Sequence, residues 1–242
     1  IEIQITDPTT DITFSGSTIV DPATAVAISD TTTIRDTVIT QENYHWRNDD
    51  GNETGATSAT GGTENTTYDT FPKSVTKRLR VAVANAGNAT SSAFAYRLEY
   101  AAKTAACGDG SLTWVDVGAG GGDFDMSNTA NLTDGNDTTN IGVGSGGVTS
   151  ANADFETPNA GIKDTSSQTA NITLDSTDYV ELEYSIIGAG TIPDGSTYCF
   201  RVTDAGSATD ISYTNYPELT VAADVLVDTT GTQITSALIP ST

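Results

Sequence analysis

The 242-residue chain is poor in the residues that most catalytic and metal sites use, with one histidine and two cysteines. Bases are also few: 10 lysines and arginines stand against 32 acids, which gives a net charge of −22. Such a surface repels phosphate backbones and anionic lipid headgroups, so binding to nucleic acid or to a membrane surface is not expected. No apolar run approaches the roughly 18 residues of a membrane-spanning helix.

Good helix formers are scarce as well. Leucine, lysine, glutamate and methionine are few, whereas threonine, glycine, asparagine, aspartate and alanine dominate. Threonine favours strands because its branched Cβ suits a pleated surface, and most of the others favour turns. A hydrophobic content of 36% is low, but it suffices for strands that bury only one face. The composition therefore predicts an all-β protein.

The hydrophobic pattern predicts many short strands. Residues 77–85 are the clearest case, with leucine and valine on the inner face and Arg78 and Arg80 on the outer face. We expect this segment to form a hairpin with residues 93–102. Further candidate strands lie at residues 1–6, 12–14, 17–20, 24–29, 36–40, 42–47, 111–117, 170–174, 179–187, 197–202 and 218–223, with two more in the tail.

Long polar loops separate these strands. Residues 48–70 and 118–168 are rich in glycine, threonine and asparagine, and the second stretch has room for one or two short strands. No window shows a helical repeat over three turns. The predicted fold is an antiparallel two-sheet sandwich, immunoglobulin-like or jelly-roll-like, with long Gly/Thr/Asn-rich loops; a barrel is the less common alternative.

Several segments together resemble a known type of module. They are "YHWRNDDG", "LRVAVANAGNA", "YRLEYA", "VELEYSI" and "YCFRVTDAG". The set resembles β-sandwich modules of large secreted surface proteins of environmental bacteria, where such modules recur beside lectin-like and immunoglobulin-like domains. The resemblance covers roughly residues 41–222 and implies an extracellular location and a structural or adhesive role. Its motifs are strand and turn patterns without a catalytic signature.

The resemblance suggests a division of the chain. We expect an N-terminal extension at residues 1–40, a sandwich core at 41–222, and C-terminal strands at 223–242 that complete the sandwich or contact a neighbour. The chain starts at Ile1 instead of a methionine, which we interpret as a mature product exported with a cleaved signal peptide.

The two cysteines, Cys107 and Cys199, are far apart and have no metal-type spacing. In an exported chain, a disulfide between them is the simplest interpretation, and two separate buried thiols are the alternative. The chain also carries Asn-X-Ser/Thr sequons, whose glycosylation depends on the host. The candidate acceptors are Asn52, Asn65, Asn88, Asn131, Asn136 and Asn171.

The segment "NYHWRNDDGNET" at residues 43–54 is the first candidate for chemistry. Side chains alternate along a strand, so if Tyr44 and Trp46 fill the core, His45 points to solvent or to a loop. That position argues against a catalytic triad, and no hydrolase, metalloprotease or phosphate-binding motif occurs. We expect a strand followed by a turn, no catalytic residues and no enzyme.

Metal and sugar sites are the remaining candidates. The acid-rich segments at residues 48–51, 121–128 and 132–140 do not match a calcium-loop spacing, so solvated turns are favoured over a calcium site and no cofactor is expected. Tyr198, Tyr213 and Tyr216 could form a carbohydrate platform, but core or rim packing is the more common role of such tyrosines.

The leading functional expectation is a structural subunit of an extracellular filament or surface assembly, pilus-like and built from copies of itself. Ile1, Ile3 and Ile5 alternate with polar residues, and this strand could add to the open sheet edge of a neighbouring subunit. The alternative for this strand is that it completes its own sandwich. The alternative function is an adhesin or carbohydrate-binding surface module, with host or cell-surface glycans as partners.

Overall fold

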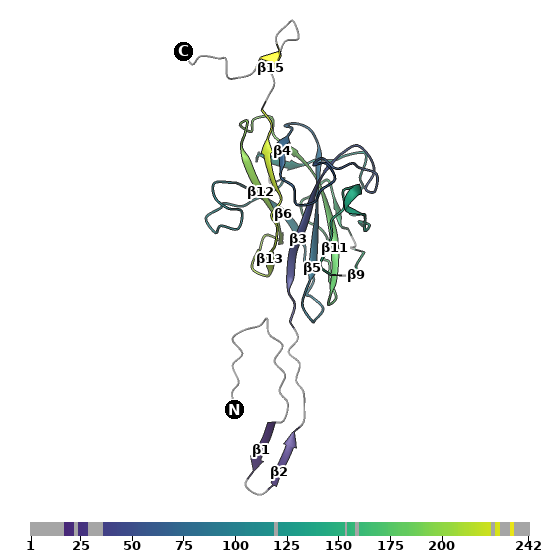
Figure 1. Ribbon diagram of the computed structural model, residues 1–242, viewed down its shortest axis with the longest axis vertical. Coiled ribbons are helices and arrows are strands. Elements are labelled where there is room, and N and C mark those ends of the chain that lie inside the picture. The colour runs from purple at the N-terminus through teal and green to yellow at the C-terminus, as the bar shows by residue number, and fades with distance from the viewer. Residues whose placement is uncertain are drawn as a thin grey trace.

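The computed structural model describes residues 36–118, 121–152, 154–157 and 160–223, together with the backbone of four short strands outside these ranges. The predicted all-β, two-sheet sandwich is confirmed: a seven-stranded and a five-stranded sheet pack face to face (Figure 1). The helical part of the described chain is a single turn of 3-10 helix at Val143–Ser145.

The larger sheet is built around three long antiparallel strands. Its main path runs β10, β11, β5, β3, β13, and β8 and β9 pair with other parts of β11. The bounds are β3 (Ile39–Asn48), β5 (Lys77–Asn85), β8 (Phe124–Met126), β9 (Asp154–Phe155), β10 (Ile162–Lys163), β11 (Asp178–Gly188) and β13 (Ile211–Tyr213). Three short strands, β9, β10 and β13, pair in parallel with their long neighbours.

The smaller sheet runs in the order β4, β14, β12, β6, β7. Its bounds are β4 (Tyr68–Phe71), β6 (Tyr96–Ala102), β7 (Val115–Asp116), β12 (Thr197–Asp204) and β14 (Glu218–Val221). β12 pairs with β6 from Tyr198 to Asp204, whereas β14 and β4 form a parallel pair at one edge.

Four further strands lie outside the sandwich ranges. β1 (Ser17–Asp21) pairs with β2 (Thr24–Ile28), and β15 (Leu226–Val227) pairs with β16 (Gln233–Ile234). Within the described part of the chain, each of these strands has its hairpin mate as its strand partner. The predicted strand at residues 1–6 lies outside the described residues.

The predicted hairpin between residues 77–85 and 93–102 is wrong. β5 lies in the larger sheet, whereas β6 lies in the smaller sheet beside β12. The connection instead bonds to a distant segment: Ser91 donates to the carbonyl of Leu174, and Phe94 to that of Ile172. These bonds carry the chain across from one sheet to the other. Residues 170–174, predicted as a strand, contribute an isolated bridge there.

The core between the sheets follows the predicted alternation. The leucine and valines of β5 are fully buried, and so is Trp46 on β3. Trp46 meets Phe200 of the opposite sheet edge-to-face, with ring centroids 5.4 Å apart, and Phe124 meets Phe200 at 5.1 Å. Such edge-to-face contacts add to the free energy gained from burying the rings.

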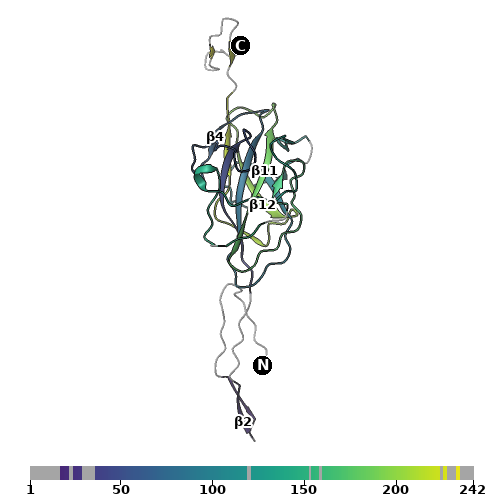
Figure 2. The ribbon, with the colours of Figure 1, turned by 90° about the vertical axis from the view of Figure 1, so that its right-hand side faces the viewer.

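The chain enters and leaves the sandwich at opposite poles (Figures 1 and 2). β3 begins at Ile39 opposite Asn85, which ends β5. At the other pole, β14 ends at Val221 opposite Phe71, and Ala222 donates to the carbonyl of Phe71 at 2.9 Å. The sequence continues on both sides, with 35 residues before position 36 and 19 after position 223.

Cys107 and Cys199 form a disulfide, with Cα atoms 5.6 Å apart and a sequence separation of 92. Cys199 lies on β12, so the bond fastens the segment after β6 to the outer face of the smaller sheet.

Replacing both cysteines by alanine is expected to lower the free energy of unfolding by about 4–5 kcal/mol, because the bond restricts a long loop of the unfolded chain. Urea unfolding followed by circular dichroism measures the change, and unfolding the native chain with reductant is the control. Equal midpoints with and without the bond would contradict this expectation.

Candidate functional site

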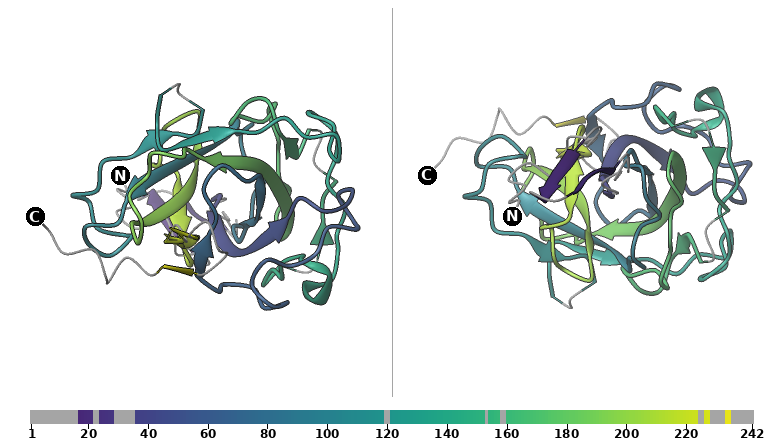
Figure 3. Two further views of the ribbon diagram at one scale, coloured as in Figure 1. Left: turned by 90° about the horizontal axis from the view of Figure 1, so that it is seen from above. Right: turned by 90° about the horizontal axis from the view of Figure 1, so that it is seen from below.

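The outer face of the larger sheet carries a cluster of ionisable side chains from the three long strands. The residues are His45 and Arg47 on β3, Arg78 and Arg80 on β5, and Glu181 and Glu183 on β11. All six are buried, because two loops, residues 49–66 and 127–149, cover this face (Figure 3). Arg78 and Arg80 face away from the core as predicted, but they do not reach solvent.

Glu183 is the centre of a buried ion network. Its two carboxylate oxygens accept from Nη1 of Arg47 at 2.8 and 2.7 Å. Nη1 of Arg80 donates to the same carboxylate at 2.5 Å, and Nη1 of Arg78 lies 3.4 Å from it. One carboxylate on β11 thus contacts guanidinium groups from β5, which pairs with β11, and from β3, the next strand of the sheet, so it ties the three central strands together.

The covering loops are fastened to the same arginines. Asp49 accepts from Nε of Arg78 at 2.8 Å, and Glu53 accepts from Nη1 of Arg80 at 2.7 Å. Glu53 also accepts from the backbone and hydroxyl of Thr139 at 3.1 and 2.8 Å, which joins the two loops to each other. Charge-assisted hydrogen bonds of this kind are stronger than neutral ones.

The side chain of Arg47 restricts which residues of the two covering loops can pack against it. Its Nη2 donates to the carbonyl of Ala56 at 3.0 Å, from the first loop. On the second loop, a Cβ at Gly146 would lie 2.7 Å from Nε of Arg47, and Gly146 has a φ of +83°. Only glycine suits this position, because it has no side chain to collide and tolerates positive φ.

The network holds four carboxylates against three guanidinium groups. Glu181 contacts Nε of Arg80 through Oε2, but its Oε1 has no hydrogen-bond partner among the described residues. Burial raises the pKa of the Glu181 carboxyl to about 7, although the nearby guanidinium of Arg80 acts in the opposite direction. A neutral Glu181 leaves three negative groups facing three positive ones, and this balance suits a buried site.

His45 is fully buried between the sheet and both loops. Its Nδ1 lies 2.9 Å from the carbonyl of Gly147, and its Nε2 lies 2.8 Å from Oγ of Ser58. A carbonyl can only accept, so Nδ1 carries the proton and Nε2 accepts from the serine hydroxyl. Burial lowers the pKa of His45, with the charge of Arg47 adding to the effect. The imidazole joins two loops across the strand, which agrees with the prediction that it points to a loop.

The acid-rich segments are also occupied by internal bonds. Asp134 accepts from the backbone of Asp164 at 3.0 Å and from Nζ of Lys163 at 2.7 Å. Asp123 accepts from the hydroxyl of Tyr198 at 2.7 Å. In the part of the chain that the structure describes, no three His, Cys, Asp or Glu side chains are arranged to hold a metal ion.

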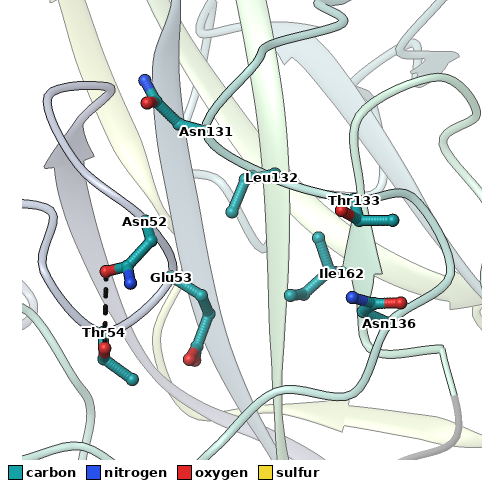
Figure 4. A pocket seen from close by; sticks show the side chains of 8 residues that line it. All are labelled: Asn52, Glu53, Thr54, Asn131, Leu132, Thr133, Asn136 and Ile162. Atoms are coloured by element: carbon teal, nitrogen blue, oxygen red, sulfur yellow. Dashed lines mark hydrogen bonds between the residues drawn. The ribbon is translucent and has the colours of Figure 1, made fainter.

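A polar hollow of about 270 Å³ opens between the two covering loops (Figure 4). It is lined by Asn52, Glu53, Thr54, Asn131, Leu132, Thr133, Asn136 and Ile162. Three sequon asparagines lie on its rim and are exposed, as are Asn65 and Asn171 elsewhere, whereas Asn88 is half-buried. The carboxylate of Glu53 is already engaged by Arg80 and Thr139, so the hollow offers no free charged group.

The outer face of the smaller sheet carries a second, smaller apolar cluster around the disulfide. Tyr216 stacks on Tyr213 at 5.0 Å between centroids and on Trp114 at 6.1 Å. The guanidinium carbon of Arg201 lies 4.2 Å from the centre of the Trp114 ring, within cation–π range. Two of the three tyrosines considered for a platform, Tyr213 and Tyr216, are therefore side by side, whereas Tyr198 is buried in the core between the sheets, in line with the favoured packing role.

Two residues with a clear part in the structure, Trp114 and Gln41, are not indicated by the strand pattern of the sequence. The sequence predicts a strand at residues 111–117, but the strand there is only Val115–Asp116, and Trp114 lies just before it. Gln41 is buried and its side chain bonds to two separate segments. The signal for Trp114 was its closeness to Cys107 in sequence. A lone glutamine in a strand carries no such signal.

Comparison with known proteins does not place the chain in a family. No family model matches it, and no curated protein matches it. The structure supports the resemblance described above only as far as a strand-rich, sandwich-like fold. No helix among the described residues is long and apolar enough to span a membrane.

Replacing Glu183 with glutamine is expected to lower the free energy of unfolding by about 3–5 kcal/mol, because three buried guanidinium groups lose their shared carboxylate. Glu156→Gln is the matched control, since Glu156 is exposed. Urea denaturation measures both variants. A loss for Glu183→Gln no larger than that for the control would refute the network's importance.

The raised pKa of Glu181 gives a stability contribution with a definite pH dependence. The folded state holds the proton more tightly than the unfolded state, where the ordinary value is 4.5, so this contribution is full below pH 4.5 and is lost as the pH rises through 7. Relative to Glu181→Gln, the native chain should therefore lose stability between about pH 4.5 and 8. Urea titrations of both proteins across this range test the sign, and a constant or widening advantage of the native chain would disprove it.

Proposed function

We propose that this protein is a structural subunit of an extracellular filament or surface assembly. The observation that carries the proposal is the entry of the chain at one pole of the sandwich and its exit at the opposite pole (Figures 1 and 2). A module of this shape passes its chain straight through and can be joined end to end. The disulfide and the absence of a membrane-spanning helix among the described residues are compatible with an extracellular protein.

The use of the polar side chains supports a structural role. His45 and the three buried arginines bind the covering loops to the sheet, so they are committed to internal contacts. A catalytic group must reach its substrate, whereas these side chains are fully enclosed. The resemblance to surface modules of environmental bacteria points in the same direction.

Subunits of such an assembly need a joint, and the N-terminal strand can provide it. One edge of the smaller sheet is β4, a strand of four residues whose Phe71 lies at the exit pole; the other edge strand, β7, has only two residues. A strand from the next copy, approaching with its entry pole, would add to this edge head to tail. Burying Ile1, Ile3 and Ile5 there contributes about 1.5–3 kcal/mol for each side chain.

An adhesin is the second candidate, and its strongest candidate binding surface is a row of aromatic rings. Trp114 and Tyr216 lie beside the disulfide on the outer face of the smaller sheet, and Tyr213 of β13 extends them into a half-buried row of rings. Rings that bind sugars offer an open face, whereas these rings cover one another and Arg201 covers Trp114. The row therefore suits the packing of the disulfide segment better than the binding of a glycan.

Deleting residues 1–6 is expected to leave a folded monomer that no longer assembles. Electron microscopy and light scattering of the native and truncated chains measure the assembly, and circular dichroism checks the fold. Ile3→Asn should weaken assembly strongly, while Gln4→Asn, on the polar side of the same strand, should not.

Normal assembly of the truncated chain would refute the donated strand. A native chain that stays monomeric under all conditions would refute the structural subunit itself and would favour the adhesin.

A further inference from the structure

Because the chain enters and leaves the sandwich at opposite poles, tension along the chain would act on the sandwich through its first and last strands. Tension pulls β3 at Ile39 out through the entry pole and pulls β14 at Val221 out through the exit pole. Both strands lie along the line between the poles, so each is pulled along its own axis (Figures 1 and 2). In this shear geometry all hydrogen bonds to a neighbouring strand resist together, whereas in unzipping they break one after another.

The first element to resist the tension is β14, which pairs with β4 on one side and with β12 on the other. Val221 donates to the carbonyl of Ser196, and Ala222 donates to that of Phe71, each at 2.9 Å. Nε1 of Trp46, in the opposite sheet, donates to the carbonyl of Glu218 at 2.9 Å. β14 is short, however, and its pairing with β12 covers only three residue pairs.

The second element to resist the tension is β13, which precedes β14 in the chain. It pairs directly with β3, the strand at which the chain enters the sandwich. β13 pairs in parallel with the first residues of β3, from Ile211 opposite Ile39 to Tyr213 opposite Gln41. Thr214 donates to the carbonyl of Gln41 at 2.9 Å. Once β14 is free, tension pulls β13 and β3 in opposite directions along their shared axis. Residues 39–42 and 211–215 are called the terminal clamp below.

Gln41 strengthens the terminal clamp with its side chain. Its Nε2 donates to the carbonyl of Asn215 at 2.7 Å, and its Oε1 accepts from the backbone of Val202 at 2.7 Å. Asn215 in turn donates to the carbonyl of Glu42 at 2.9 Å. The glutamine is buried, so water does not compete for these bonds. One side chain thus joins the entry strand to the exit segment and to the smaller sheet.

We propose that the sandwich is a tension-bearing module, in which the terminal clamp is loaded in shear and the buried ion network holds β3 within its sheet. The inference deepens the proposed function and rests on it for its biological sense. The disulfide gives the module a second property, because it limits how far the chain can extend after the clamp breaks. Of the 188 residues from 36 to 223, the 92 positions between the cysteines stay closed, which leaves 96 to extend.

Single-molecule force spectroscopy on the full chain, with handles at both termini, tests this directly. The oxidised chain should release roughly 350 Å of contour length from the sandwich and the reduced chain roughly 680 Å, before subtracting the folded length. The geometric control uses the N-terminus and a handle at Ala86→Cys. Ala86 is exposed at the entry pole, and both native cysteines are bonded, so the new thiol is the one that reacts.

Pulling between the termini should need a rupture force at least about threefold higher than pulling through position 86, because the second geometry unzips β3 from β5 bond by bond. Thr214→Pro removes the backbone donor to Gln41 and should lower the terminal rupture force, whereas Thr214→Ala keeps that donor and should not. Thr214 is exposed, so neither change disturbs the core.

Equal rupture forces in the two pulling geometries would overturn the proposal, even if Thr214→Pro fails to fold. So would equal terminal forces for folded Thr214→Pro and Thr214→Ala. The measurement uses single chains and needs no assembly. A strong clamp in a chain that never assembles would refute the proposed subunit alone, and filaments built from weak modules would refute the clamp alone.

Discussion

The contact between Glu183 and three arginines is the interaction on which the rest of the structure depends. It joins β3, β5 and β11 on the face opposite the apolar core, and the same arginines reach Asp49, Glu53 and five loop carbonyls. Burying charge is unfavourable unless every charge is paired. Here the pairing comes from loops that are rich in glycine, threonine and asparagine and have little apolar surface to bury. The ion network therefore replaces a second hydrophobic core.

This arrangement also explains how an acidic, base-poor chain uses its positive charge. Three of its six arginines lie in the network, and Arg201 covers Trp114 on the other sheet. The positive charge of these arginines is thus paired inside the fold, while much of the excess negative charge stays at the surface. An acidic exterior keeps separate molecules apart, so any assembly needs a specific joint such as a donated strand.

The sequence allowed the fold class to be predicted, because alternation is a local property. Residues 77–85 formed the expected strand with its arginines facing outward. Their burial could not be predicted, since the groups that cover them come from loops elsewhere in the chain, including Thr139. The hairpin with residues 93–102 failed for the same reason: the bonds from Ser91 and Phe94 lead to residues 172–174. The role of Gln41 likewise depends on contacts more than 150 positions away.

Native-state hydrogen exchange tests most directly whether the ion network makes the long loops part of the cooperative fold. The amides of Ala59 and Ser127, which bond from the loops to Trp46 and Ser185, should exchange with opening free energies within about 1 kcal/mol of that for Val81 in β5. Exchange of the two loop amides by local opening, with little protection while Val81 stays protected, would show that the loops merely lie on the sheet and would contradict the account.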